Sequence, residues 1–316
     1  MIRTIIIISM FLMHSLYPFS HAEVNAIPPF KLHEPCYLLA SDNEQLAYYP
    51  FAVTKATKEI VVLYHGASLY SNRMYQWIAR DLTNMNVATV LVDMRGHGRS
   101  GGVRGDAPSV VRMYQDVDEI MDHLTTQYPD AQLYAAGHSS GAGLLLNYVD
   151  WKQQKSEPVP FKGLIFLAPY LGPNSGCTRF TPNQPECFAK EVRPWVYILN
   201  ALSGGYLCKH TRAVTFRYPE QELLNDALIV PTQTCVLSCA LSPYDPQSLF
   251  KKLSLPFTMF IGSHDEQLIA QKVISFAHMA DSSYNKKAEI IDNAKHLSIV
   301  LDAPRLIVVS LRSFNE

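Results

Sequence analysis

The sequence has little charge and almost no excess of either sign. Its 316 residues include 27 Lys and Arg against 28 Asp and Glu, which gives a formal net charge of −1, and charged residues make up 17% of the chain. Proteins that bind nucleic acid or an anionic membrane across a broad surface carry a clear positive excess. The balance argues against a nucleic-acid partner and favours a small or neutral substrate.

The chain also lacks internal repeats and low-complexity blocks, and beyond its first residues it lacks any run apolar enough to span a bilayer. A spanning helix needs roughly 20 apolar residues. These absences exclude repeat architectures and multispan membrane proteins. With 48% hydrophobic residues, the chain has enough apolar material for one large domain or two small ones.

The first residues, MIRTIIIISMFLMHSLYPFSHA (1–22), have the pattern of a secretory signal peptide. Arg3 precedes an apolar run over residues 5–16, Pro18 interrupts it, and a small-residue pattern ends at Ala22. The apolar run is too short for a spanning helix. We therefore expect cleavage after Ala22 and export of the mature chain to the periplasm or the medium. An uncleaved membrane anchor is the alternative.

Export changes how the cysteines are interpreted. Cys36 stands alone, and the other five crowd into one later region: Cys177, Cys187, Cys208, Cys235 and Cys239. An even number of cysteines in an oxidising compartment favours disulfides, although the sequence does not fix their pairing. A zinc site would need close Cys or Cys/His pairs, and only Cys235 and Cys239 approach that spacing. We expect disulfides.

Short runs of β-branched, aromatic and aliphatic residues alternate with segments of helical period. The runs predict strands over residues 59–66, 87–96, 131–139, 163–170, 257–265 and 288–294. Their near-continuous apolar character is typical of a parallel sheet covered on both faces. The alternation predicts a doubly wound, mostly parallel α/β sheet. The stretch CYLLASDNEQLAYYPFAV (36–53) predicts an antiparallel hairpin at the edge of that sheet.

Residues from about 171 to 243 break the alternation of strands and helices. They carry five cysteines and many prolines and show no clean strand pattern. A loop of that length without secondary structure does not suit a compact domain. We expect an inserted cap with helices of its own, stapled by disulfides, lying over the ends of the strands.

The stretch LYAAGHSSGAGLLL (133–146) places two serines where a predicted strand meets a predicted helix. Only Ser139 has a glycine two positions before it, Gly137, and two positions after it, Gly141. This is the pattern of a nucleophile elbow, in which the glycines relieve crowding around a strained turn. Ser140 then begins the helix, so we expect its backbone N–H to face a developing oxyanion. Its side chain need not react.

A serine nucleophile needs a histidine base. In a doubly wound sheet with a nucleophile elbow, this histidine follows the serine in the chain. His296 follows the predicted strand 288–294 in the loop KHLSIV, at the expected edge of the sheet. His278 is the rival, but it lies in a helical stretch. We expect His296 to be the base.

The histidine in turn needs a carboxylate that follows the serine and precedes the histidine. Asp265 comes just after the strand FTMFIG, which is the expected place. Glu266 and Asp292 are weaker rivals. We expect Asp265 to orient the base.

The loops after two earlier strands are also candidates for chemistry. His65-Gly66-Ala67 follows the strand VVLY, so the backbone N–H of Ala67 is the expected second oxyanion donor. The loop DMRGHGRSGG (93–102) is glycine-rich but lacks the Walker and G-x-G-x-x-G patterns of phosphate sites. We interpret its histidine, His97, as structural.

Five motifs together resemble an α/β-hydrolase of the monoacylglycerol lipase, lysophospholipase and serine-aminopeptidase-like group. In chain order they are HGASLYSNRMY, DMRGHGRSGG, GHSSGAG, GSHDEQL and NAKH. The resemblance implies Ser139 as nucleophile, Asp265 and His296 as its partners, and Ala67 and Ser140 as backbone oxyanion donors.

The chain departs from that group's pattern at two places. Ser68 stands where the group often has glycine, and in the elbow Ser140 and Ala142 replace a methionine and the last glycine. These positions line or support the acyl pocket, so the substrate does not follow from the resemblance. The elbow also lacks the tryptophan of proline iminopeptidases, which argues against peptidase activity.

We therefore expect an exported serine hydrolase that cleaves carboxylic esters, with lipid-like substrates such as monoacylglycerols or lysophospholipids. A carboxylesterase for short-chain or aromatic acyl esters is the alternative, and a peptidase, an amidase or an idle binding protein is less well supported. No metal or organic cofactor is implied. The expectation of lipid-like substrates rests on the resemblance and on an expected cap rich in Tyr, Phe, Trp and Leu (RPWVYILNAL, 193–202, and LCKHTRAVTFRYP, 207–219). Transient contact with a membrane surface is a further expectation.

Overall fold

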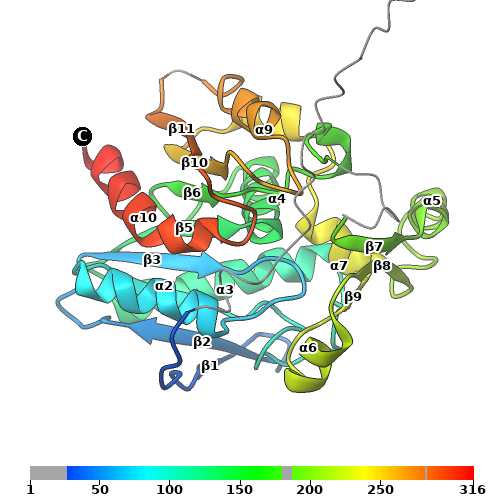
Figure 1. The fold of residues 1–316 in the computed structure, drawn as a ribbon, viewed down its shortest axis with the longest axis horizontal. Coiled ribbons are helices and arrows are strands. Elements are labelled where there is room, and N and C mark those ends of the chain that lie inside the picture. The colour runs from blue at the N-terminus through cyan, green and yellow to red at the C-terminus, as the bar shows by residue number, and fades with distance from the viewer. Residues whose placement is uncertain (1–26, 180–186, 282) are drawn as a thin grey trace, which may run out of the picture.

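The computed structural model describes residues 27–179, 187–281 and 283–316. The predicted signal peptide, residues 1–22, lies outside the described residues. Within them, the fold is built on one large sheet with helices on both faces and a smaller sheet to one side (Figure 1).

The large sheet has eight strands in the order β1-β2-β4-β3-β5-β6-β10-β11. Their bounds are β1 Cys36–Leu39, β2 Gln45–Phe51, β3 Glu59–Tyr64, β4 Ala88–Val92, β5 Gln132–His138, β6 Leu164–Leu167, β10 Phe257–Gly262 and β11 Lys286–Ile291. The strands from β4 to β11 run parallel, whereas β1 and β2 form an antiparallel hairpin at one edge. The predicted fold class and the predicted edge hairpin are both confirmed.

The apolar character of the central strands follows from their burial. All five residues of β4 and all six of β10 are buried, as are five of the six residues of β3. A strand covered on both faces has no solvent side on which polar residues could alternate. This explains why these strands appear in the sequence as continuous apolar runs.

Helices cover both faces of the sheet (Figure 1). Helices α2 (Arg73–Asn84) and α10 (Ile299–Asn315) pack together on one face, and α3 (Val110–Gln127), α4 (Ser140–Gln154), α8 (Pro246–Lys252) and α9 (Ala270–Ala277) lie on the other. Helices α2 and α3 begin where the sequence supplies a cap: the side chain of Asn72 accepts from the N–H of Met74 at 3.1 Å, and that of Ser109 accepts from Arg112 at 2.9 Å.

Residues 171–179 and 187–243, which we call the insert, carry a second small sheet and a final helix that packs against α3 and α4. They contain η1 (Pro173–Ser175), β7 (Ala189–Val192), α5 (Pro194–Leu202), β8 (Arg212–Phe216), α6 (Glu220–Asn225), β9 (Thr232–Thr234) and α7 (Cys235–Leu241). The three strands form an antiparallel sheet that lies beyond the carboxyl ends of the parallel strands (Figure 1). The region has helices of its own, as expected, and it also contains three strands that the sequence pattern did not indicate. The strands are short, partly polar and shifted in register, so they leave little alternation in the sequence.

The insert has its own hydrophobic core. The core consists of Val196, Ala213, Val214, Phe216 and Cys235. Ala67, from the loop that follows β3, packs against this core. The insert is thus joined to the loop that the sequence predicts to supply an oxyanion donor.

The expected disulfides are absent, because all six cysteines are free thiols in the structure. Cys36 is exposed in β1, the edge strand of the large sheet, whereas the other five cysteines all lie in the insert. Cys235 and Cys239 lie one turn apart on α7, and burial together with its neighbour Cys239 raises the pKa of the Cys235 thiol to about 12. The insert is therefore held by packing rather than by disulfides.

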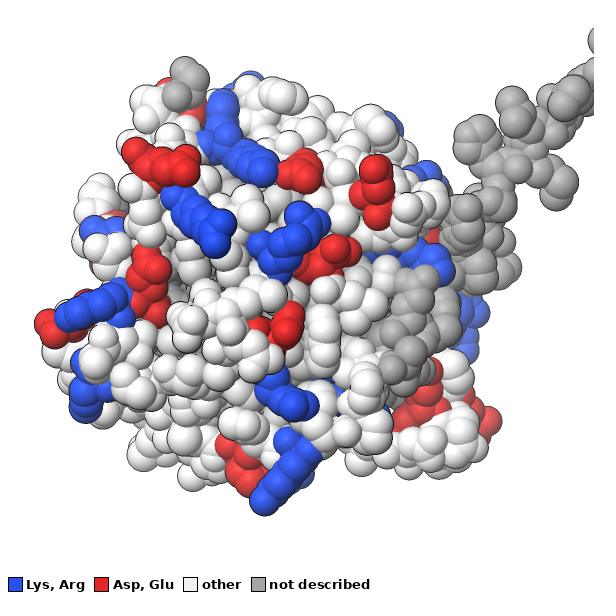
Figure 2. Space-filling model, turned by 60° about the vertical axis from the view of Figure 1, so that its left-hand side comes forward, with Lys and Arg blue, Asp and Glu red and all other residues white. Residues whose placement is uncertain are grey.

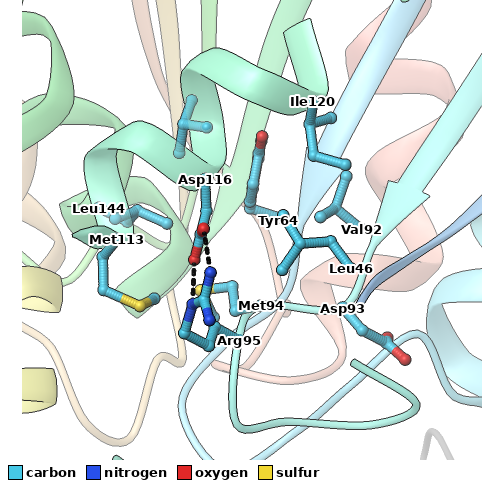
Figure 3. Close-up of a pocket in the computed structure, with 11 residues that line it drawn as sticks. Leu46, Tyr64, Val92, Asp93, Met94, Arg95, Met113, Asp116, Ile120 and Leu144 are labelled. Carbon is cyan, nitrogen blue, oxygen red and sulfur yellow. Dashed lines mark hydrogen bonds and ion pairs between the residues drawn. The ribbon is translucent and has the colours of Figure 1, made fainter. Parts of the chain in front are cut away.

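A buried ion pair between Arg95, in the glycine-rich loop 93–102, and Asp116 holds this loop against α3 (Figure 3). The Arg95 guanidinium makes two hydrogen bonds of 2.7 Å to the carboxylate of Asp116 on α3, and a third of 3.1 Å to Asp42. Arg95 is almost fully buried, beside a cavity of about 10 Å³ that Tyr64 also lines. On the surface, by contrast, charges of both signs are interspersed over the face shown in Figure 2.

Candidate active site

Ser139 lies at a tight turn between β5 and α4, in a backbone conformation that few non-glycine residues adopt. Its φ is 52° and its ψ is −116°. A Cβ on Gly137 would lie 2.5 Å from the backbone nitrogen of Ala142, and one on Gly141 would lie 2.5 Å from the carbonyl oxygen of Tyr64. Only glycine fits at either position. The turn that exposes Ser139 therefore depends on both glycines.

The structure brings Ser139, His296 and Asp265 into one hydrogen-bonded line. The Oγ of Ser139 lies 2.9 Å from Nε2 of His296, and Nδ1 of the same imidazole lies 2.8 Å from Oδ2 of Asp265. Ser139 and His296 are 157 positions apart in the chain. They meet because both follow strands whose carboxyl ends lie at the same edge of the sheet.

The carboxylate of Asp265 is held in a fixed orientation. Its Oδ1 accepts from the backbone N–H groups of Gln267 at 2.9 Å and Leu268 at 2.7 Å, which leaves Oδ2 for the imidazole. Asp265 is buried, and its carbonyl oxygen accepts from Nε of Arg179 at 2.6 Å. These contacts place the imidazole N–H donor of His296 on the Asp265 side and leave Nε2 to accept from the serine.

A second carboxylate lies next to the histidine. Oε2 of Glu266 accepts from the backbone N–H of His296 at 2.9 Å, while Oε1 is buried with no hydrogen-bond partner among the described residues. Burial opposes a charge on His296, but Asp265 and then Glu266 outweigh it and raise the pKa of the imidazole. Burial also raises the pKa of Glu266 itself. The imidazole is therefore a stronger base than an exposed histidine.

Two backbone N–H groups beside Ser139 are left without acceptors. The N–H of Ser140, at the start of α4, and that of Ala67 donate to no other residue in the described part of the chain. A Cβ placed on Gly66 would lie only 3.4 Å from Cβ of Ser139, so the loop containing Ala67 passes directly beside the serine. Unpaired backbone donors of this kind suit a developing negative charge.

Tyr75 and two further histidines link the loops around the site, and the sequence analysis missed this network. The N–H of Gly66 donates to the Tyr75 hydroxyl at 2.8 Å. The imidazole of His138 lies between Tyr75, 2.8 Å from its Nδ1, and the carbonyl oxygen of His296, 3.0 Å from its Nε2. Burial lowers the pKa of His138 to about 3 and that of His65 to about 4, so both imidazoles are neutral. The motif HGASLYSNRMY ends at Tyr75, but nothing in it indicates that this hydroxyl reaches His138.

The rival candidates lie elsewhere. His278 is exposed at the end of α9, and Asp292 is exposed after β11. His97 is buried with Nδ1 3.1 Å from the carbonyl oxygen of Arg95. The Oγ of Ser140 is buried and makes no hydrogen bond within the described residues. Of the two adjacent serines, Ser139 alone has the histidine as its hydrogen-bond partner.

A doubly wound sheet with a serine at the strand–helix turn, facing a histidine and an aspartate from later loops, defines an α/β-hydrolase. The chain belongs to the family described as serine aminopeptidase, S33, whose model matches residues 55–301.

Two curated relatives match this chain at low sequence identity. An uncharacterized abhydrolase domain-containing protein of Dictyostelium discoideum is 23% identical over 260 residues, which is 82% of this chain and 26% of that protein. The human monoglyceride lipase is 26% identical over 144 residues, 45% of this chain and 46% of that protein. The chain thus matches less than half the length of either relative.

Solved structures share the fold. The monoacylglycerol lipase of Paleococcus ferrophilus has a TM-score of 0.59 at 19% identity, over 85% of this chain and 99% of that chain. A soluble variant of the monoglyceride lipase of Saccharomyces cerevisiae, in complex with a substrate analog, has a TM-score of 0.63 at 17% identity, over 90% and 97%. Est1E of Butyrivibrio proteoclasticus, with ferulic acid bound, has a TM-score of 0.59 at 17% identity, over 89% and 100%.

Proposed function

We propose that the protein is a serine hydrolase that cleaves carboxylic esters, with Ser139 as its nucleophile. The observation that carries this proposal is the line of hydrogen bonds from Ser139 through His296 to Asp265, at 2.9 and 2.8 Å. His296 takes the proton of the Ser139 hydroxyl as the oxygen attacks the ester carbonyl. Asp265 keeps the imidazole in the tautomer that accepts at Nε2 and stabilises the imidazolium that forms.

The remaining steps use groups beside the same serine. The backbone N–H groups of Ala67 and Ser140 donate to the oxyanion of the tetrahedral intermediate. The imidazolium of His296 then gives its proton to the leaving alcohol, and an acyl-enzyme remains on Ser139. Water, activated by the same imidazole, releases the carboxylic acid and restores the serine.

The reaction is tested by comparing two adjacent serines. We expect a fluorophosphonate probe to label the unaltered chain and the Ser140→Ala variant, and to leave Ser139→Ala unlabelled. Replacing a nucleophilic serine of this kind lowers kcat by about 10⁶-fold. Ester turnover that survives in Ser139→Ala would refute the assignment, and loss of labelling in Ser140→Ala alone would move the nucleophile by one position.

We further propose that the acyl group is lipid-like, as in a monoacylglycerol or lysophospholipid. Relatives named monoglyceride lipase and an insert with an apolar core against Ala67 support this substrate class. Hydrolysis of esters of increasing acyl length tests it. We expect activity to rise beyond short chains; a maximum at acetyl or butyryl esters would favour the alternative, a carboxylesterase for short-chain or aromatic acyl esters.

Export remains a proposal that rests on the pattern of residues 1–22 alone. The expected mature N-terminus is Glu23. Sequencing the N-terminus of the protein recovered from the periplasm and the medium tests it, and an intact Met1 in a cell-associated form would contradict it.

A further inference from the structure

The loop of residues 66–71, which we call the oxyanion loop, is bonded to the insert at two places. The carbonyl oxygen of Ser68 accepts from the N–H of Val230 at 2.9 Å. The Tyr70 hydroxyl donates to Oδ2 of Asp226 at 2.8 Å, although 156 positions separate the two residues. Both partners come from one short segment of the insert, between α6 and β9 (Figure 1). The loop that carries the expected oxyanion donor is therefore tied to the insert by its backbone and by a side chain.

Ser68 has a backbone conformation that a non-glycine residue holds only with support. Its φ is 66°, in the left-handed region, and the residue is fully buried. A conformation of this kind persists where the surrounding contacts fix it. On the side of the sheet, the N–H of Gly66 donates to the Tyr75 hydroxyl at 2.8 Å, and the insert supplies the support on the other side. Ala67 lies between these two supports, so both of them determine where its N–H points.

The carboxylate of Asp226 is fixed in place by its own segment. Its Oδ1 accepts from the N–H of Leu228 at 3.0 Å, which leaves Oδ2 for the Tyr70 hydroxyl. Arg104 donates to the carbonyl oxygen of Leu228 at 2.6 Å and to that of Gly98 at 2.9 Å, so the glycine-rich loop holds the same segment. Burial, and then the hydrogen bond to Asp226, raise the pKa of Tyr70, so its hydroxyl keeps its hydrogen and donates. A hydrogen bond to a carboxylate is stronger than one between neutral groups.

We propose that Asp226 is a positioning residue for the oxyanion donor: it binds Tyr70 and thereby holds the N–H of Ala67 where the tetrahedral intermediate forms. This inference rests on the proposed ester hydrolysis. It makes the insert a working part of the active site, because the insert supplies the carboxylate that fixes the loop. A displaced donor stabilises the transition state less and leaves binding of the ester in its ground state nearly unchanged. Loss of the contact should therefore lower kcat and have little effect on KM.

Steady-state kinetics of the full chain with a soluble short-chain ester tests the proposal. Tyr70→Phe removes the donor, and Asp226→Asn leaves one oxygen where the carboxylate offers two. We expect each variant to lower kcat about 10- to 100-fold, with KM changed by less than about twofold. In Tyr70→Phe/Asp226→Asn the loss should not exceed that of the more affected single variant, because both residues act through one hydrogen bond. Losses that multiply would show that the two residues act separately and would overturn the proposal.

A reversible inhibitor supplies a readout that a general loss of stability does not move. A trifluoromethyl ketone adds to a serine hydroxyl and forms a tetrahedral oxyanion, which needs the same N–H donors as the transition state. Its Kd should rise in Tyr70→Phe by the factor by which kcat falls. A lower kcat with an unchanged Kd for the ketone would place the defect elsewhere and overturn the proposal.

The matched control is Tyr148→Phe, which removes a tyrosine–aspartate hydrogen bond to Asp118 between α4 and α3, outside the oxyanion loop. It should lower the melting temperature and leave kcat and the Kd of the ketone unchanged. An equal loss of kcat in the control and in Tyr70→Phe would contradict the proposal.

Hydrogen exchange at residues 66–71 gives a result that does not depend on turnover. We expect exchange of these backbone amides to become faster in Tyr70→Phe and to stay the same in Tyr148→Phe. Absence of ester turnover by the unaltered chain would refute the proposed function, whereas unchanged exchange in Tyr70→Phe would refute the positioning role of Asp226.

Discussion

The hydroxyl of Tyr75 lies 2.8 Å from Nδ1 of His138, although 63 positions separate the two residues. Because the hydroxyl accepts from the N–H of Gly66, it donates its own hydrogen to Nδ1. The N–H of His138 is then at Nε2 and donates to the carbonyl oxygen of His296. One chain of hydrogen bonds thus connects the loop after β3, the nucleophile turn and the loop of the proposed base.

Tyr75→Phe removes the central link of that chain. Without the hydroxyl, the N–H of Gly66 and Nδ1 of His138 are buried without partners, which costs about 1–3 kcal/mol of stability. We expect a lower melting temperature and a lower kcat with little change in KM, because the oxyanion loop and His296 are less well positioned. Ester kinetics and thermal melts measure both.

Tyr48→Phe is the control, because it breaks a tyrosine–histidine hydrogen bond of 2.9 Å, to His123, that joins β2 to α3 away from the site. It should affect stability and leave kcat unchanged. Equal losses of kcat in the two variants would show that Tyr75 acts only through general stability.

The pH at which activity falls on the acid side should depend on the charge of Glu266. His296 must be neutral to take the proton from Ser139, so activity falls as the pH drops through its pKa, which lies above the ordinary value of 6.5. Glu266→Gln removes a negative charge beside the imidazolium and destabilises it. We therefore expect the acid limb of kcat/KM to move to lower pH.

Glu289→Gln makes the same change at a half-buried residue of β11 that is paired with Lys287 away from the site, and its profile should match that of the unaltered chain. An unshifted acid limb in Glu266→Gln would mean that Glu266 is uncharged when the histidine titrates.

The buried ion pair beneath loop 93–102 should be far more important for stability than an exposed one. Arg95→Ala leaves the carboxylate of Asp116 partly unpaired in the interior, and breaking such a pair costs about 3–5 kcal/mol. Lys58→Ala breaks a pair with Asp130 whose side chains are 71% and 69% exposed, for which we expect less than about 1 kcal/mol. Urea unfolding of both variants measures the difference, and similar midpoints would contradict the burial argument.

The cysteines should all react as thiols. Protein purified without reductant and then denatured should give six equivalents of free thiol with a chromogenic disulfide reagent, because all six cysteines are free in the structure. A count of four or two would show that disulfides form after all. Native protein should react more slowly at Cys177, Cys187 and Cys235, which are buried.

The large sheet was predictable from the sequence, and the insert was not. Strands such as β4 and β10 are buried on every residue, so their apolar runs stand out from the surrounding helices. In the insert, β7 and β9 are three or four residues long and only partly buried. Their existence depends on packing around Phe216 and Val196, which tertiary contacts decide and local sequence does not.

The residues around the proposed nucleophile also fall into two groups: those that the sequence predicts and those that it does not. Ser139, Asp265 and His296 each follow a strand, and the order of the strands places such residues at one edge, so their meeting can be anticipated from the chain order. Tyr75 lies on the inner side of α2 and reaches the site only because that helix packs beside β4. The sequence offers Glu266 only as a rival acid, because its contact with the backbone of His296 has no signature in the sequence.

The φ of 52° at Ser139 has a consequence for how the chain evolves. A glycine there would release about 1–3 kcal/mol held in that backbone conformation, and we expect Ser139→Gly to melt above Ser139→Ala. A related chain that no longer had to hydrolyse esters would become more stable if glycine replaced this serine. The serine at this turn is therefore held at a cost to the free energy of folding.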